Sequence, residues 1–399
     1  MGIITNLSLL GYFKYADFFI DNINTLTQSN IPLLSLALPL AISFFTFQQI
    51  AYLIDSYRGE TKEYDFLNYA LFVTFFPQLI AGPIVHHREM MPQFFSKWNL
   101  VKQYKNIALG MFVFAIGFFK KVVIADTFSV WATNGFDKAE TLNFIEGWAT
   151  SFSYTFQLYF DFSGYTDMAI GIALFFNIKL PNNFNSPYKA LSIQDFWRRW
   201  HITLSNFLRD YIYIPLGGNR KGEFRTYSNL MITFLLGGLW HGAGWTFIFW
   251  GFLHGGALVI HRLWRKLNIK MNTLLAWFVT FNFINFTWVF FRAKEWDDAL
   301  KVLKGMFLGD KIFSYWLLEK FPSLEMYFTF GKHFEDIDDG KDITLWLIMG
   351  FVVILFFKNS VYYLNHFKPT KTNLFIFLVL ATSAILNLVH VSEFLYFNF

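Results

Sequence analysis

Two histidines in apolar surroundings are the side chains of this sequence best suited to chemistry. His241 lies inside Thr226–Ile260, a run of thirty-five residues without Asp, Glu, Lys or Arg, and His201 lies forty residues upstream. Polar groups at membrane depth are costly and tend to be functional. An apolar site disfavours the charged imidazole, so a neutral ring remains available to accept a proton as a general base. The alternative is that His241 is hydrogen-bonded between helices for packing alone.

Basic side chains cluster in the segment that holds His201. Apolar residues recur at three- or four-residue spacing through Ser192–Pro215, so we expect an amphipathic helix at the cytoplasmic membrane interface. The planar guanidinium group of arginine can form two parallel hydrogen bonds to a phosphate. Arg198 and Arg209 could therefore line the entrance of a binding site for an anionic, phosphate-bearing donor. A surface helix whose arginines contact lipid headgroups explains the same pattern.

Two acidic residues, Asp161 and Asp167, lie between apolar runs. A carboxylate at the membrane centre costs about 2.5–3.5 kcal/mol on insertion scales, so each needs a partner. The acids could orient a histidine or bind an acceptor hydroxyl. They could equally pair with Lys or Arg and hold helices together.

Other kinds of site are not indicated. The sequence has no cysteine, which excludes disulfides, zinc–thiolate sites and a cysteine-linked acyl intermediate. The adjacent His86 and His87 form too weak a pattern for a metal site, so no metal is predicted.

The elements that position these residues belong to a membrane protein. Of the 399 residues, 55% are hydrophobic and 15% are charged, against about 25% charged in soluble domains. We therefore predict an all-α, polytopic integral membrane protein. Its net charge of +5 is modest and collects in a few loops, which suits membrane orientation better than nucleic-acid binding.

Several segments are apolar enough to cross a bilayer, for which about 20 residues are needed. Four meet that length: Pro32–Ile54, Phe66–Val85, Met271–Phe291 and Asn373–Ser392. Shorter candidates are Ile3–Ile20, Asn106–Phe119, Gly147–Phe160, Met168–Ile178 and Ile343–Phe357. Together they predict about 9–11 membrane helices, some re-entrant or broken, in one membrane domain over residues 1–399. Residues 310–342 form the longest predicted extramembrane insertion.

The run Thr226–Ile260 is too long for one crossing. As a helix it would reach about 52 Å, whereas the hydrocarbon is about 30 Å thick. Glycines near His241 offer a place for a break, so we expect two helices that meet there; glycines that only permit close packing are the alternative. Lys189–Arg225 and Arg262–Lys270 are rich in Lys and Arg, which places both ends on the cytoplasmic side. Lys120-Lys121 then falls near the outer end of a span, against the same rule.

The motifs occur in an order that resembles a known family. They are Leu10–Tyr15, Phe76–Pro83, Tyr159–Tyr165, Phe196–His201, Arg209–Arg220, Gly238–Gly242, Trp288–Ala293 and Phe394–Phe399. Together they resemble the membrane-bound O-acyltransferase family, in its bacterial branch of alginate and peptidoglycan O-acetylation proteins. The resemblance covers essentially the whole chain. Family chains usually carry further membrane helices before the first motif, and these are expected to be missing here.

The resemblance implies a fold with a funnel, an activity and a site. The family's invariant membrane histidine falls on His241, and its second position, a His, Asn or Asp, falls on His201. Donor- or substrate-binding candidates are Arg198, Arg199, Arg209, Asp210, Trp240, Asp161 and Asp167.

The same branch implies that acetyl passes from a cytoplasmic donor, acetyl-CoA, across the bacterial inner membrane. No bound cofactor is expected. The expected partners are a periplasmic esterase-like O-acetyltransferase, membrane lipid and, indirectly, an exported polysaccharide. D-alanyl transfer to envelope polymers, or transport of an acyl donor without chemistry, are the alternatives.

Overall fold

The computed structural model describes residues 1–399 except 62–65, 80–81, 311, 314–319, 323–328, 331–332, 389–394 and 396–399. Its described secondary structure is helical apart from two two-residue strands, β1 (Ile312–Phe313) and β2 (Thr329–Phe330), which pair in parallel. This confirms the all-α prediction. Much of the predicted insertion at 310–342 lies outside the described residues.

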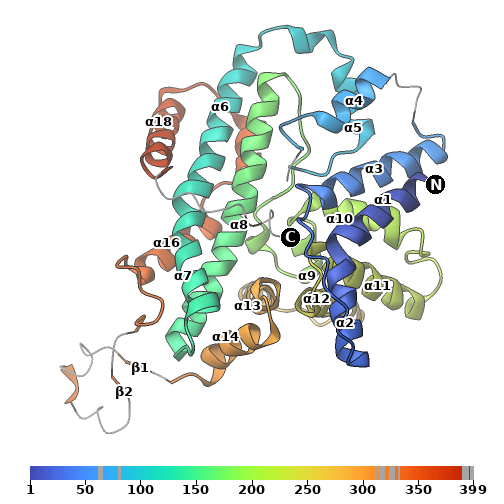
Figure 1. The fold of residues 1–399 in the computed structure, drawn as a ribbon. Coiled ribbons are helices and arrows are strands. Elements are labelled where there is room, and N and C mark those ends of the chain that lie inside the picture. The colour runs from blue at the N-terminus through green and yellow to red at the C-terminus, as the bar shows by residue number, and fades with distance from the viewer. Residues whose placement is uncertain are drawn as a thin grey trace.

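Two long antiparallel helical stretches form the centre of the molecule (Figure 1). One is α8 (Phe144–Phe175); the other runs through α6 (Tyr104–Phe119), the π-helical turn η3 (Lys120–Ala125) and α7 (Asp126–Thr133). Glycines let the two backbones approach closely, since a Cβ at Gly117 would collide with the carbonyl oxygen of Gly164. The separately predicted spans Gly147–Phe160 and Met168–Ile178 are thus parts of one helix.

Buried ion pairs cross this central interface. Lys120 Nζ lies 2.6 Å from Asp167 Oδ2, and Lys121 Nζ lies 2.7 Å from Asp161 Oδ1 and 2.9 Å from Asp126 Oδ1. The alternative in which the acids pair with basic residues is therefore confirmed. The two lysines lie within a helical stretch that continues past them, and their charges are neutralised inside the bundle.

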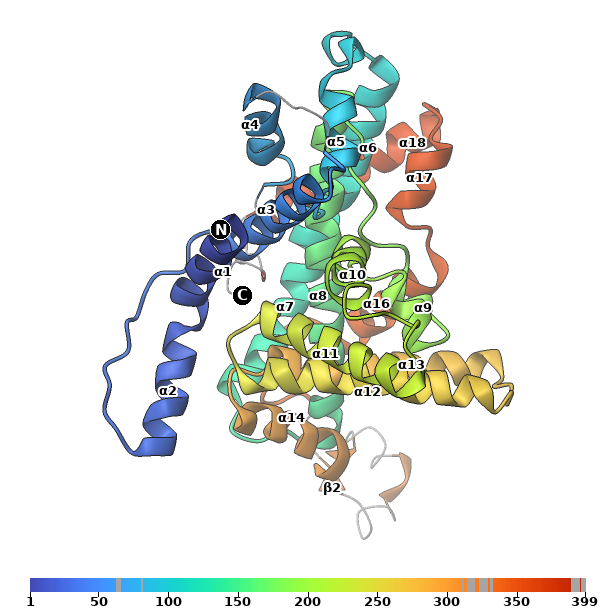
Figure 2. The ribbon, with the colours of Figure 1, turned by 90° about the vertical axis from the view of Figure 1, so that its right-hand side faces the viewer.

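A helical hairpin crosses the central pair (Figure 2). Its arms are α11 (Glu223–His241) and α12 (Trp245–Lys266), so the predicted break at His241 is confirmed. Close packing through glycine is present as well, since a Cβ on Gly238 would collide with the carbonyl oxygen of Phe247. Glu223 and Lys266 form an ion pair, so the start of α11 and the end of α12 lie next to each other. The loop charges likewise predict that these two ends lie on the same side of the membrane.

Within the described part of the chain, three helical regions are long and apolar enough to cross a membrane by length and composition: Tyr104–Lys138, Thr273–Arg292 and Ile343–His366. They confirm the predicted apolar segments near Asn106–Phe119, Met271–Phe291 and Ile343–Phe357. A shorter apolar helix, α18 (Lys371–Leu386), covers much of the predicted Asn373–Ser392 span, whose last residues lie outside the described part.

Two predicted spans were wrong. In Pro32–Ile54 the helix α3 starts only at Ile42, and residues 29–39 have no regular structure. In Phe66–Val85 the helix α4 ends at Thr74 and a turn follows. Prolines lie in both non-helical parts; they lack the backbone N–H and disfavour the helical conformation of the preceding residue.

The remaining elements surround this frame. They are α1 (Gly2–Leu10), η1 (Gly11–Tyr15), α2 (Ala16–Thr27), α5 (His87–Phe94), η2 (Lys97–Leu100), η4 (Asn134–Lys138), η5 (Pro187–Lys189), α9 (Ile193–Trp197), α10 (Ile202–Leu208), η6 (Arg209–Tyr213), α13 (Thr273–Arg292), α14 (Trp296–Leu308), α16 (Ile343–Phe356) and α17 (Ser360–His366). The bounds of α3 are Ile42–Tyr57 and those of α4 are Phe66–Thr74.

Candidate active site

His241 is the last residue of α11, directly before the non-helical Gly242–Gly244. Its side chain is buried among aromatic rings. The ring centroids of Trp240 and Phe291 each lie 4.9 Å from the imidazole, and that of Trp250 lies 5.2 Å away. The helix break therefore places a titratable ring in an apolar cage.

The N-terminal helices hold the end of α11 in place. Lys14 Nζ donates hydrogen bonds to the carbonyl oxygens of Trp240 (2.6 Å) and His241 (3.2 Å). The Tyr15 hydroxyl donates to the carbonyl of Leu239 at 2.7 Å. Carbonyls in the last turn of a helix lack intrahelical donors and carry partial negative charge, so a cation is favourable there. Sequence reasoning missed Lys14 as a site residue, although it lies in the first family motif.

His201 lies between α9 and α10 in the left-handed region, with φ of 43°. The prediction of one continuous amphipathic helix over Ser192–Pro215 was wrong at this point. Phe196, Trp197 and Trp200 are all buried, so the segment has no lipid- or solvent-facing apolar stripe and instead turns inside the protein. Because the helix is interrupted here, the His201 side chain points in a direction that it would not have in a continuous helix.

A hydrogen bond from His201 Nδ1 to the amide oxygen of Asn183 orients the His201 ring. The Asn183 Oδ1 atom accepts from the backbone N–H of Thr203 (3.2 Å) and from its hydroxyl (2.9 Å), and it lies 3.1 Å from His201 Nδ1. An acceptor oxygen requires that Nδ1 carry the proton, which leaves Nε2 as an acceptor. His201 lies outside the candidate membrane helices, and its burial lowers its pKa to about 3, so the ring stays neutral.

The rings of both histidines, His201 and His241, contact the ring of Trp240. The ring centroid of Trp240 lies 6.3 Å from that of His201 and 4.9 Å from that of His241, and the two imidazoles are close enough to interact electrostatically. Phe162 covers another side of His201 at 4.8 Å. The structure thus brings together three of the residues that the sequence singled out.

A cavity of about 400 Å³ opens beside this cluster on the basic segment. It is lined by Gln194, Trp197, Arg198, Ile202, Ser205, Asn206, Leu208, Arg209, Tyr213, Leu230, Thr233, Phe234 and Leu258. Arg198 and Arg209, both exposed, supply its positive charge. Arg199 does not line the cavity, because its Nε binds Asp195 Oδ1 at 2.8 Å.

A route of aromatic rings joins this arginine cavity to His241. The ring of Trp197 lies in the wall of the cavity and 5.8 Å from Trp250, which in turn packs on His241. His254 fixes that wall, because its Nδ1 accepts from Trp197 Nε1 at 3.2 Å. Its other nitrogen lies 3.0 Å from the Thr287 hydroxyl, so His254 links α9 to α13 and has a structural role.

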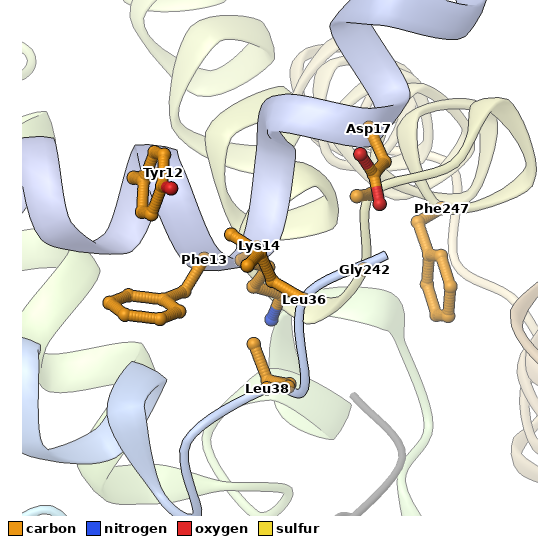
Figure 3. A pocket seen from close by; sticks show the side chains of 9 residues that line it. Tyr12, Phe13, Lys14, Asp17, Leu36, Leu38, Gly242 and Phe247 are labelled. Carbon is orange, nitrogen blue, oxygen red and sulfur yellow. The ribbon is translucent and has the colours of Figure 1, made fainter. Parts of the chain in front are cut away.

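A second cavity, of about 330 Å³, lies at the helix break (Figure 3). It is lined by Tyr12, Phe13, Lys14, Asp17, Leu36, Leu38, Gly242, Ala243 and Phe247. The arginine cavity contacts α11 at Leu230, Thr233 and Phe234, whereas this one contacts the chain at Gly242. Phe234 and Gly242 are eight residues apart, about 12 Å of helix, so the two cavities contact this part of the chain at separate places.

Two other candidates lie elsewhere. Asp161 and Asp167 are held by lysines in the α6–α8 interface and line neither of these two cavities. Asp210 pairs with Arg209 at 2.7 Å, and it therefore partly neutralises one of the two cavity arginines.

The helical fold, its long apolar helices and the two buried histidines define a helical integral membrane protein with a histidine-containing interior site. The model of MBOAT, the membrane-bound O-acyltransferase family, matches residues 6–293. The chain belongs to this family. The resemblance drawn from the motifs is thereby confirmed.

Curated relatives include a peptidoglycan O-acetyltransferase, probable alginate O-acetylases and teichoic acid D-alanyltransferases. The chain is 62% identical to a peptidoglycan O-acetyltransferase of Helicobacter pylori, over 77% of this chain and 64% of that protein. It is 44% identical to a probable alginate O-acetylase of Pseudomonas aeruginosa, over 77% of this chain and 59% of that one. The chain thus spans less than two thirds of the length of these two relatives. It is 29% identical to a teichoic acid D-alanyltransferase of Bacillus subtilis, over 64% of this chain and 69% of that protein.

Proposed function

We propose that the protein is a multi-pass inner-membrane O-acyltransferase that passes acetyl from cytoplasmic acetyl-CoA toward an exported polysaccharide, with peptidoglycan as the acceptor. The meeting of His201 and His241 on Trp240, next to an arginine-lined cavity, is the observation that carries the proposal. Identity supports the acceptor: 62% to a peptidoglycan O-acetyltransferase, against 44% to an alginate O-acetylase and 29% to a D-alanyltransferase.

The donor binds in the arginine cavity. Arg198 and Arg209 are exposed at its wall and contact the phosphates of the coenzyme, for which guanidinium groups are well shaped. The thioester end then extends past Trp197 and Trp250 toward His241. Apolar walls along that path exclude water and so limit hydrolysis of the thioester.

His241 acts as the general base. It accepts the proton of the acceptor hydroxyl while the hydroxyl oxygen attacks the thioester carbonyl. The C–S bond then breaks, and the leaving coenzyme thiolate takes that proton, so the acetyl ester and free CoA are the products. His201, whose Nδ1 is held by Asn183, accepts a hydrogen bond through Nε2 from a second hydroxyl of the acceptor and so orients it. The second cavity, at the break, admits the acceptor from the other end of α11.

Purified protein in liposomes with labelled acetyl-CoA outside tests this function. We expect free CoA on the donor side and label on an acceptor such as a peptidoglycan fragment with its periplasmic partner. His241→Ala should abolish both, by at least about 10²-fold for the loss of positioned proton transfer, at unchanged membrane level. His366→Gln, an exposed histidine in α17, is the matched control and should keep full activity.

Three results would overturn the proposal. Intact labelled acetyl-CoA in the lumen would identify a transporter without chemistry. Transfer of D-alanine but not acetyl would move the protein to the D-alanylation branch. Unchanged acetyl transfer by His241→Ala would remove His241 from catalysis.

A further inference from the structure

Two histidines and an aspartate converge at a place distant in sequence from the acyl-transfer site. Asp55 lies near the end of α3, whereas His86 and His87 lie at the start of α5. One ligand atom of each residue lies within 4.8 Å of the other two. Asp55 and His87 are buried, and His86 is partly exposed, so the cluster has a closed base and one side open to entry.

Two of the three distances between these atoms match the edges of a tetrahedral metal site. Asp55 Oδ2 lies 3.3 Å from His86 Nδ1 and 3.4 Å from His87 Nδ1. A zinc ion with bonds of about 2.0–2.2 Å holds neighbouring tetrahedral ligand atoms about 3.3–3.5 Å apart. Charge-assisted hydrogen bonds between nitrogen and a carboxylate are shorter, at about 2.7–2.9 Å. The observed distances therefore suit two edges of a metal tetrahedron better than two direct hydrogen bonds.

The hydrogen-bond chain around Tyr211 sets the tautomer of His86. The Tyr211 hydroxyl donates to Asp55 Oδ2 at 2.8 Å, and its oxygen lies 2.5 Å from His86 Nε2. With that hydroxyl proton directed to Asp55, His86 Nε2 donates to Tyr211. The Nδ1 lone pair of a neutral His86 ring then faces a carboxylate oxygen, and a metal ion between the two atoms makes this arrangement favourable.

Nearby positive charge does not fill that role. The closest guanidinium, that of Arg58, approaches the other oxygen of Asp55, Oδ1, at 3.9 Å and lies over the ring of Tyr211. Oδ2 therefore remains turned toward the two imidazoles. The contact of His86 Nε2 with Tyr211 is also the outer-shell contact that metal-binding histidines usually make, which fixes the ring and raises its basicity.

We propose that Asp55, His86 and His87 bind a divalent transition-metal ion, for which zinc is the best match. Two imidazoles and one carboxylate form a ligand set of intermediate softness, typical of zinc and unlike the all-oxygen sites of Mg²⁺ or Ca²⁺. A fourth position stays open to water on the exposed side of His86. The ion joins the end of α3 to the start of α5 and, through Tyr211, to the η6 segment that carries Arg209.

Metal content of the full-length, tag-free protein in detergent tests the site. The protein is stripped with a chelator, dialysed, loaded with Zn²⁺ and analysed for zinc per chain; Co²⁺ in place of zinc reports coordination geometry by its visible absorption. We expect one ion per chain, tetrahedral Co²⁺ bands and a higher thermal unfolding temperature with zinc. Failure of the wild type to retain zinc at one per chain would overturn the proposal, whatever the variants do.

Substitutions distinguish the residues that bind the metal ion from Tyr211, which only holds a ligand in place. His87→Gln and Asp55→Asn should weaken zinc binding by at least about a hundredfold, and Tyr211→Phe by about ten- to a hundredfold. His366→Gln, outside the cluster, should bind zinc as the wild type does. His86→Gln, at the partly exposed position, serves if the buried variants do not fold. Zinc binding by His86→Gln that equals the wild type, with unchanged Co²⁺ bands, would also overturn the proposal.

Discussion

The Lys14 ammonium lies 3.2 Å from the carbonyl oxygen of His241, 227 residues along the chain. It also bonds to the carbonyl of Trp240 at 2.6 Å, so one cation closes the last turn of α11. This cation holds the backbone of the proposed base without touching the imidazole. Lys14 is therefore a positioning residue.

Replacing Lys14 by Met should impair both stability and transfer. The side chain keeps its approximate length but loses these hydrogen bonds. Because burial lowers the pKa of Lys14 to about 7, each bond contributes as one from a neutral donor does, about 0.5–1.5 kcal/mol. We expect a lower thermal unfolding temperature and a lower kcat with little change in the KM for acetyl-CoA, because the arginine cavity is intact. Lys14→Arg should restore part of kcat, while Lys294→Met, at an exposed lysine, should behave as wild type. An equal loss of kcat in Lys294→Met would argue against this role.

Asn183→Leu should lower turnover through His201. The variant removes the oxygen that accepts from both His201 and Thr203, so the imidazole can rotate and change tautomer. Misorientation at this scale costs up to about a hundredfold in kcat. Asn183→Asp retains an acceptor and should recover most of the rate, and Asn365→Ala, in the exposed part of α17, is the control. If Asn183→Leu and Asn183→Asp have the same kcat, the hydrogen bond has no catalytic importance.

The two cavity arginines should determine affinity for the donor. Arg198→Gln and Arg209→Gln each remove a charge from the wall of the cavity, and each should raise the KM for acetyl-CoA by about tenfold or more. The KM should also rise with ionic strength in the wild type and less in the double variant. Arg199→Gln is the internal control, because Arg199 is adjacent to Arg198 in sequence but does not line the cavity. A larger effect at Arg199 than at Arg198 would place the donor elsewhere.

The sequence predicted elements best where one physical limit ruled out the alternatives. Thr226–Ile260 is longer than a bilayer allows, so the break at His241 followed from length and from the glycines. Asp161 and Asp167 needed partners for the same energetic reason, and these partners are Lys121 and Lys120. The sequence did not predict that the two acids pair with lysines and not with histidines, because this pairing depends on how α8 packs against α6.

Other features depend on contacts that no local pattern contains. The spacing around His201 fits a helical stripe, but Trp197 and Trp200 are both buried in the core and the chain turns at His201. Lys14 reaches α11 from the opposite end of the chain. His86 and His87 were too weak a signal alone, since Asp55 reaches them only through the fold.

Gly238→Ala should separate the arms of the hairpin that carries His241. A Cβ at this position meets the backbone carbonyl of Phe247, which cannot rotate away, so α11 and α12 must move apart. Overpacking of this kind costs about 1–3 kcal/mol, and the shift displaces His241 three residues further on. Gly256→Ala, in the same hairpin, has open space around its Cβ and should be neutral or stabilising by up to about 1 kcal/mol from helix propensity. Thermal unfolding and acetyl transfer of both variants give the comparison. Equal activity and stability in the two would show that the close contact of α11 with α12 is not needed to position the histidine.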